Sequence, residues 1–109
     1  RYDIIRHAEL VHGDIAVAAV EKEIDRVTAA KAADELLTLS GIHASVVLYK
    51  RGTGVNLSAR SLGEINVQFI MEKLGGGGNS TTAGGQVADA TVDEVRERLL
   101  AAIDEYTEE

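Results

Sequence analysis

The chain has 109 residues, of which 45% are hydrophobic and 27% are charged, a composition typical of one globular domain. Its formal net charge of −7 argues against binding to duplex nucleic acid or tRNA, which proteins hold through a basic surface, but not against a small phosphorylated ligand. The absence of cysteine excludes disulfides and thiolate metal sites, and no apolar run reaches the roughly 20 residues of a membrane span.

The N-terminal part of the chain predicts two helical segments with a strand between them. Apolar residues at helical spacing within residues 1–10 predict the end of a helix. Residues 15–20 form a short apolar run after turn residues, which predicts a strand. Residues 24–39 repeat apolar side chains at helical spacing, and Ser40 and Gly41 are expected to end that helix.

The middle of the chain predicts a hairpin followed by a helix. Residues 43–50 are β-branched and apolar, which favours a central strand. Residues 52–54 predict a tight turn, and residues 55–61 are the expected partner strand. Residues 65–74 place apolar side chains at helical spacing, so we expect a helix with one buried face.

The C-terminal part predicts a last strand and a capped helix. Residues 82–87 have small side chains and are expected to form a short strand. Thr91 and Glu94 have the spacing of a capping box at the start of the final helix. Together the elements predict a small α/β structure of the α+β type over residues 1–109, with a mixed sheet, one hairpin and three to four helices.

Glycine is concentrated in one short segment. Six of the eleven glycines lie between Leu74 and Gly85, directly after the predicted helix. Glycine tolerates positive φ and has no side chain to hold a ligand away, so backbone N–H groups in such a run can converge on an anion. A flexible linker is the alternative, but side-chain donors follow at once at Asn79 and Ser80. The run therefore predicts a phosphate-binding loop.

A polar face is predicted for the strand at residues 55–61. Strand alternation places Asn56, Ser58 and Arg60 together, opposite the apolar residues. Arginine has a planar fork suited to phosphate oxygens, whereas an edge strand with a solvated face is the alternative. The short helix after Arg60 returns the chain as the glycine run, so both are expected to meet at one site.

The segments SARSLGEINVQ at residues 58–68 and IMEKLGGGG at residues 70–78 resemble the DHH-associated C-terminal domain of DHH phosphoesterases. Within that family the similarity is greatest to the membrane-bound cyclic-di-AMP phosphodiesterases (GdpP type). Weaker similarity continues through residues 33–37, 44–49 and 102–106, so the resemblance covers essentially the whole chain.

The resemblance implies a substrate-binding domain. In that family a separate catalytic DHH domain holds manganese and supplies the hydrolytic water, while the associated domain closes over it and binds the nucleotide. The implied substrate-binding residues are Ser58, Arg60, Ser61, Asn66, Gly76, Gly77, Gly78 and Asn79. No catalytic residue, metal ligand or cofactor is implied in this chain, and residues 1–10 are the expected end of the connection from the catalytic domain.

One residue departs from the family pattern. The family motif ends in histidine after four glycines, and this chain has Asn79 there. Asparagine keeps a neutral donor and an acceptor but cannot carry positive charge or transfer a proton near pH 7. Because a hydrogen bond to a charged group contributes roughly 1.5–3 kcal/mol, we expect weaker phosphate contact and a loss of one to two decades in affinity.

The remaining side chains do not predict catalysis by this chain alone. His7, His12 and His43 lie in separate predicted elements without a metal-binding spacing, and no Ser–His–Asp arrangement can be argued. The acidic residues are scattered as on solvated helix faces.

The expected function is therefore substrate binding within a manganese-dependent phosphodiesterase acting on cyclic-di-AMP, other cyclic dinucleotides or short oligonucleotides. Expected partners are that ligand, the DHH domain of the same parent chain and, in a homodimer, a second copy. The resemblance implies a cytoplasmic domain of a parent anchored in the bacterial membrane. Two alternatives stay open: a tRNA-contact or association module, as at the C-terminal end of alanyl-tRNA synthetases, and a nucleotide sensor without turnover.

Overall fold

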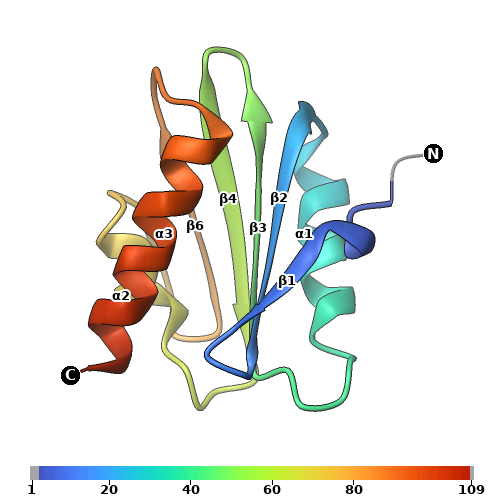
Figure 1. Ribbon diagram of the computed structural model, residues 1–109, viewed down its shortest axis with the longest axis vertical. Helices are drawn as coiled ribbons and strands as arrows, with labels where there is room; N and C mark the ends of the chain where they lie inside the picture. The colour runs from blue at the N-terminus through green and yellow to red at the C-terminus, as the bar shows by residue number, and fades with distance from the viewer. Residues whose placement is uncertain (1–2, 109) are drawn as a thin grey trace.

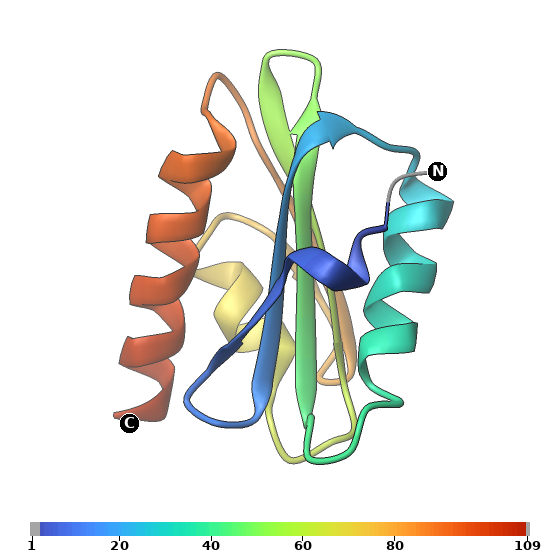
Figure 2. The same ribbon diagram turned by 45° about the vertical axis from the view of Figure 1, so that its right-hand side comes forward.

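The computed structural model describes residues 3–108, which form one six-stranded sheet with helices on both faces. The strands are β1 (Ala8–Val11), β2 (Ile15–Glu23), β3 (Ala44–Arg51), β4 (Gly54–Ser61), β5 (Gly77–Gly78) and β6 (Thr82–Val87). The helices are α1 (Arg26–Leu36), α2 (Val67–Glu72) and α3 (Val92–Thr107), and a 3-10 turn, η1, spans Ile5–His7. Figures 1 and 2 show α2 and α3 on one side of the sheet and α1 on the other.

The sheet has the order β1-β2-β3-β4-β6-β5 and is mixed. β2 and β3 are parallel and joined through α1, whereas the other neighbouring pairs are antiparallel. β3 and β4 form the predicted hairpin, in which Arg51 pairs with Gly54 across a two-residue turn. The predicted fold class, a mixed sheet with a hairpin and three to four helices, is confirmed for the described part of the chain.

Each face of the sheet has its own hydrophobic core. The larger core lies between the sheet and the pair α2 and α3, and it includes Leu48, Leu57 and Leu99. The smaller core joins α1 to β2 and β3, and it contains no residue of β4 or β6. α1 extends no further than β4, where Asp34 contacts Arg60, so the polar side of β6 and part of that of β4 have no helix over them.

Local capping signals explain where the helices begin. The Asp25 side chain accepts a hydrogen bond from the Thr28 backbone N–H and caps α1. Thr91 and Glu94 form the predicted capping box of α3. α1 ends at Leu36, earlier than predicted, and turns lead from there to Gly41 at φ 83°. None of the described helices is long and apolar enough to cross a membrane.

The prediction of a helix at residues 1–10 is wrong for the residues that the structure describes, which exclude Arg1 and Tyr2. After η1, β1 pairs antiparallel with β2 from Ala8↔Ala18 to Val11↔Ile15. Residues 8–11 directly precede β2 in the sequence, so their backbone N–H and C=O groups can hydrogen-bond to it. The stability gained from these hydrogen bonds outweighs the weak helical preference of the apolar spacing. The Arg96 guanidinium then holds β1 against α3, because its Nε and Nη2 donate to the two Glu9 carboxylate oxygens at 2.7 and 2.9 Å.

Candidate functional site

The uncovered face of β4 and β6 forms the floor of a cleft of about 410 Å³. The register places Asn56 beside Gln86 and Arg60 beside Thr82, so polar side chains of both strands share this face. Residues of α1 form one wall, and Gly77 and Gly78 of β5 form the other. The cleft therefore exists because one helix is too narrow to cover the whole sheet.

The alternation predicted for β4 is confirmed. Val55, Leu57 and Ala59 are 1%, 4% and 0% exposed and belong to the core under α2 and α3. Asn56, Ser58 and Arg60 line the cleft on the opposite face. The strand thus anchors the site by its apolar side and presents the polar side to a ligand.

The Arg60 guanidinium is held in place by its own strand and by α1. Nη1 donates to the Ala59 carbonyl at 2.9 Å and to Ser58 Oγ at 3.2 Å, and Nε donates to Asp34 Oδ1 at 3.1 Å. The Arg60 side chain is 18% exposed, whereas that of Asp34 is 64% exposed. Nη2 makes no hydrogen bond with any described residue, so part of the fork remains free to bind. This arrangement fixes the orientation of a cation that could bind an anion in the cleft.

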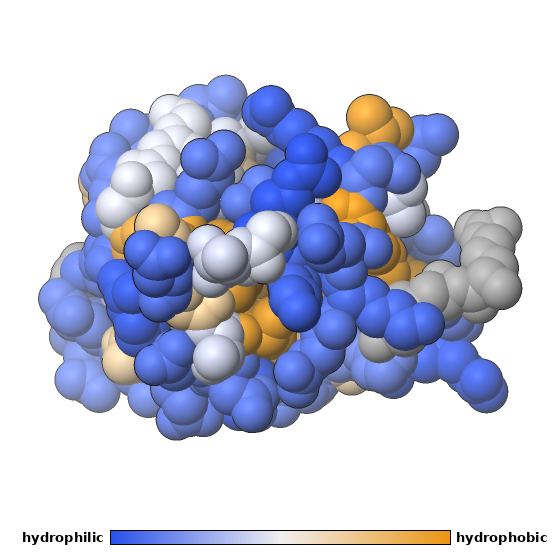
Figure 3. Space-filling model, turned by 90° about the horizontal axis from the view of Figure 1, so that it is seen from above, coloured by the Kyte–Doolittle hydropathy of each residue, from blue (hydrophilic) through white to orange (hydrophobic). Residues whose placement is uncertain are grey.

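A second cleft, of about 550 Å³, adjoins the first toward the β3–β4 hairpin and shares Arg26, Asn56 and Gln86 with it. Viewed from the hairpin end, the surface is mainly hydrophilic, with apolar atoms deep in the gaps between polar side chains (Figure 3). Arg26, Arg51 and Arg60 line the two clefts, whereas none of the Asp and Glu residues in the described range does. In a chain of net charge −7, this is a local region suited to an anion.

The glycine run, predicted as a loop, contains the edge strand β5, which pairs with β6. A Cβ on Gly76 would lie 2.2 Å from the Gly84 carbonyl oxygen. Gly78 has φ 144°, and a Cβ there would lie 2.5 Å from the Ala83 Cα. Gly77, in contrast, has no heavy atom within 4 Å of such a Cβ. Gly76 and Gly78 therefore permit close strand contact, and Gly77 leaves the cleft open.

Ser61 and Asn66 do not line the cleft. The Ser61 hydroxyl donates to the Ile65 carbonyl at 2.6 Å and accepts from the Gly63 N–H at 2.9 Å, so it fixes the connection to α2. Asn66 caps α2, because its Oδ1 accepts hydrogen bonds from the Gln68 and Phe69 N–H groups at 3.0 and 3.3 Å. The Asn66 backbone N–H donates to the Tyr106 hydroxyl at 2.9 Å. Both side chains hold the elements that frame the site.

Asn79 closes the turn between β5 and β6. Its Oδ1 accepts hydrogen bonds from the N–H groups of Thr81 and Thr82 at 3.0 and 2.9 Å, and from the Thr81 hydroxyl at 3.2 Å. Asn79 follows Gly78 directly, and Gly78 lines the cleft. The residue at the family's histidine position thus uses its side-chain oxygen to shape the cleft wall rather than leaving it free.

Several lining residues were not predicted as site residues from the sequence, among them Arg26, Tyr49 and Gln86. Tyr49 and Gln86 flank Asn56 in the sheet register, and Arg26 begins the helix that forms the wall. These residues line the cleft only because of which strands are neighbours in the sheet and where α1 lies. The polar alternation of β4 and the glycine run were the sequence signals that pointed to this face.

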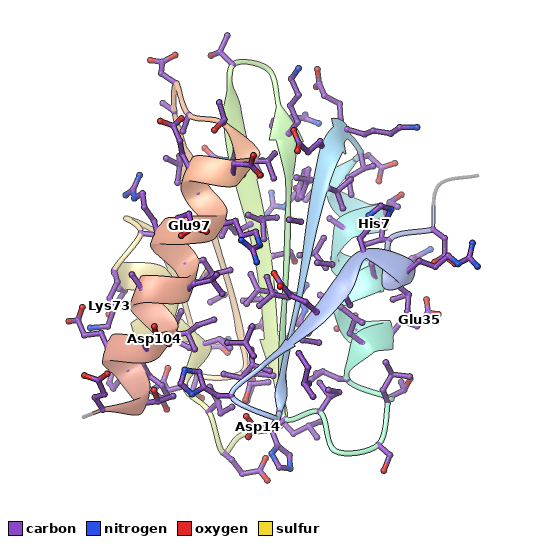
Figure 4. All side chains as sticks on the ribbon, viewed as in Figure 1. His7, Asp14, Glu35, Lys73, Glu97 and Asp104 are labelled. Atoms are coloured by element: carbon purple, nitrogen blue, oxygen red, sulfur yellow. The ribbon has the colours of Figure 1, made fainter. Side chains whose placement is uncertain are left out.

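The described residues contain no group of three His, Asp or Glu side chains that could hold a metal ion. Figure 4 shows Asp14, Glu35 and Asp104 on separate parts of the molecule. His43 instead contacts Asp14, with Nδ1 and Oδ2 3.0 Å apart, and this hydrogen bond, aided by the negative charge of Glu64, raises the pKa of His43. The His43 contact joins loops at the end of the sheet where β2 and β3 begin.

Comparison with known proteins identifies relatives over nearly the whole chain. Residues 12–109 match the family model described as the DHHA1 domain. The chain is 50% identical over 111 residues to the cyclic-di-AMP phosphodiesterase GdpP of Geobacillus thermodenitrificans, covering 99% of this chain. It is 43% identical over 109 residues to the cyclic-di-AMP phosphodiesterase PdeA of Listeria monocytogenes, covering 97% of this chain. The match spans 17% of the length of each of these relatives.

A solved structure shares the fold at lower sequence identity. The C-Ala domain of alanyl-tRNA synthetase from Aquifex aeolicus superposes with a TM-score of 0.69 and 19% identity. The match covers 87% of this chain and 96% of that domain. At this identity the comparison establishes the common fold.

Proposed function

The chain belongs to the DHHA1 domain family, and on that premise we propose that it is the substrate-binding domain of a manganese-dependent phosphodiesterase. Its ligand is a cyclic dinucleotide, cyclic-di-AMP first, or a short oligonucleotide. The observation that carries the proposal is the fixed Arg60 fork in a cleft lined by no carboxylate among the described residues. The described residues contain no group of ligands for a metal ion. In this proposal a separate DHH domain of the parent protein would hold the manganese.

Binding in this proposal is a replacement of one anion by another. A phosphate reaching Arg60 takes over the free Nη2 and competes with the exposed Asp34 carboxylate for Nε. Ser58 Oγ and the Ala59 carbonyl keep Nη1 in position during the exchange. The unpaired side of the edge strand β5 adds backbone groups at the opposite wall. The same cation then stabilises negative charge that develops on the phosphoryl oxygens during hydrolysis.

Calorimetric titration with cyclic-di-AMP and its linear dinucleotide tests the proposal. Loss of the Arg60 hydrogen bonds in Arg60→Ala is expected to weaken binding by about 10- to 100-fold. Arg98→Ala is the matched control, because Arg98 lies on α3 beyond the opposite face of the sheet. Equal affinities for the wild type and Arg60→Ala would contradict the proposal.

A second candidate function is tRNA contact or association, which the match to the C-Ala domain supports. The net charge of −7 counts against it, since tRNA binding requires many phosphate contacts. A tRNA-Ala minihelix that bound at physiological salt, while cyclic-di-AMP did not, would favour this candidate. A nucleotide sensor is distinguished from a phosphodiesterase by an assay of the parent protein. A sensor would bind the dinucleotide without hydrolysing it.

A further inference from the structure

Three neutral polar side chains form a row across the open face. Tyr49 pairs with Asn56 between β3 and β4, and Asn56 pairs with Gln86 between β4 and β6, so all three point to the same side. All three line the cleft that contains Arg60. The row is therefore a continuous floor of hydrogen-bonding groups beside the cation.

The Tyr49 hydroxyl is unusual in this row because the residue is buried and the hydroxyl has no hydrogen-bond partner in the described part of the chain. Tyr49 is 2% exposed, yet its hydroxyl makes no hydrogen bond with a residue that the structure describes. Buried hydroxyls are nearly always hydrogen-bonded. Since no fully enclosed side-chain oxygen or nitrogen in the described range lacks a partner, this hydroxyl opens into the cleft. A buried tyrosine thus directs an unused donor and acceptor at the ligand space.

The two amides are also unused. Neither Asn56 nor Gln86 makes a side-chain hydrogen bond with any residue between positions 3 and 108. An amide presents a donor and an acceptor side by side, which matches N7 and the N6 amino group of adenine. Guanine presents two acceptors, O6 and N7, on the same edge, so an amide pairs with it less well.

We propose that Tyr49, Asn56 and Gln86 form a nucleobase subsite that selects adenine; this rests on the proposed phosphate-binding role of Arg60. Asn56 lies four residues before Arg60 on β4, about 13 Å along the strand, which leaves room for a ribose between the two subsites. Arg26 lines the same space from α1 and presents a planar group on which a base can stack. The domain thereby contributes base specificity as well as charge.

The test is an NMR titration of the 109-residue chain with three ligands: adenosine 5′-monophosphate, guanosine 5′-monophosphate and ribose 5-phosphate. We expect the adenosine nucleotide to bind most tightly. Tyr49→Phe removes one hydroxyl and is expected to weaken adenosine binding about three- to tenfold, with ribose 5-phosphate unaffected. Tyr106→Phe is the matched control, since that hydroxyl binds the Asn66 N–H away from the cleft. Gln86→Leu, at an exposed position, supplies a second variant without a folding penalty.

Each result decides between the two proposals. Equal binding of all three ligands, abolished by Arg60→Ala, would overturn the base subsite and leave the phosphate site standing. A preference for adenosine that Tyr49→Phe and Gln86→Leu both leave unchanged would also overturn it. No binding of any of the three at millimolar concentration would overturn both.

Discussion

Arg60 illustrates how neighbouring residues fix the orientation of one side chain in the cleft. Two of its three hydrogen-bond partners lie on β4 itself, so the strand orients the guanidinium without any ligand. The third, Asp34, is mostly exposed and is therefore readily displaced, because exposed ion pairs contribute at most about 1 kcal/mol. Adjacent Ser61, on the other face, serves the connection to α2 instead.

At the same scale, Asn79 is expected to act through the turn that it closes. Asn79→Ala removes the acceptor of three hydrogen bonds and should lower the free energy of unfolding by about 1 kcal/mol, measured by urea denaturation. Asn79→Asp keeps that acceptor and should preserve stability, but its charge beside Gly78 should weaken cyclic-di-AMP binding. If Asn79→Asp destabilises the protein as much as Asn79→Ala, the turn role is wrong. Asn79→His tests whether a cationic donor there strengthens the phosphate contact.

At the scale of elements, the glycine run lies against β6 at a distance that requires glycine at two positions, Gly76 and Gly78. β5 and the preceding Gly76 lie so close to β6 that side chains at Gly76 and Gly78 would overlap the neighbouring backbone. The sequence could not predict this pairing, because a glycine strand carries no alternation to fix its register. The hairpin of β3 and β4, the capped α3 and the two faces of β4 were predictable, since alternation and capping residues are local signals. β1 was not, because only its pairing with β2 makes it a strand.

Substitutions at Gly77 in β5 and at the preceding Gly76 separate close packing from ligand access. Gly76→Ala should lower the free energy of unfolding by about 1–3 kcal/mol, the usual cost of overpacking. Gly77→Ala should leave stability nearly unchanged, since its Cβ meets no atom within 4 Å. Because Gly77 pairs with Gly84 and both line the cleft, the added methyl should occupy space that the ligand needs and weaken cyclic-di-AMP binding by about fivefold or more. Denaturation and calorimetry on both variants check this, and a stable, fully binding Gly76→Ala would refute the packing argument.

At the scale of the whole molecule, the site results from unequal coverage of the two sheet faces. α2 and α3 bury one face, whereas α1 leaves β4 and β6 open on the other (Figure 2). The net charge of −7 does not indicate this cluster of positive charge. Arg26, Arg51 and Arg60 are far apart in the sequence and lie together only in the folded chain. Arg60 was identifiable from its strand, but Arg26, Tyr49 and Gln86 join it through the register and the placement of α1.

The central claim is that a nucleotide binds on this open face. The most direct measurement is an NMR titration of the 109-residue chain with cyclic-di-AMP, following every assigned backbone amide. Saturable shifts are expected in β4, β5, β6 and the first turn of α1, with β1 and α3 unaffected, because the latter two lie away from the cleft. Shifts confined to β1 and α3, or no shifts at millimolar ligand, would contradict the account.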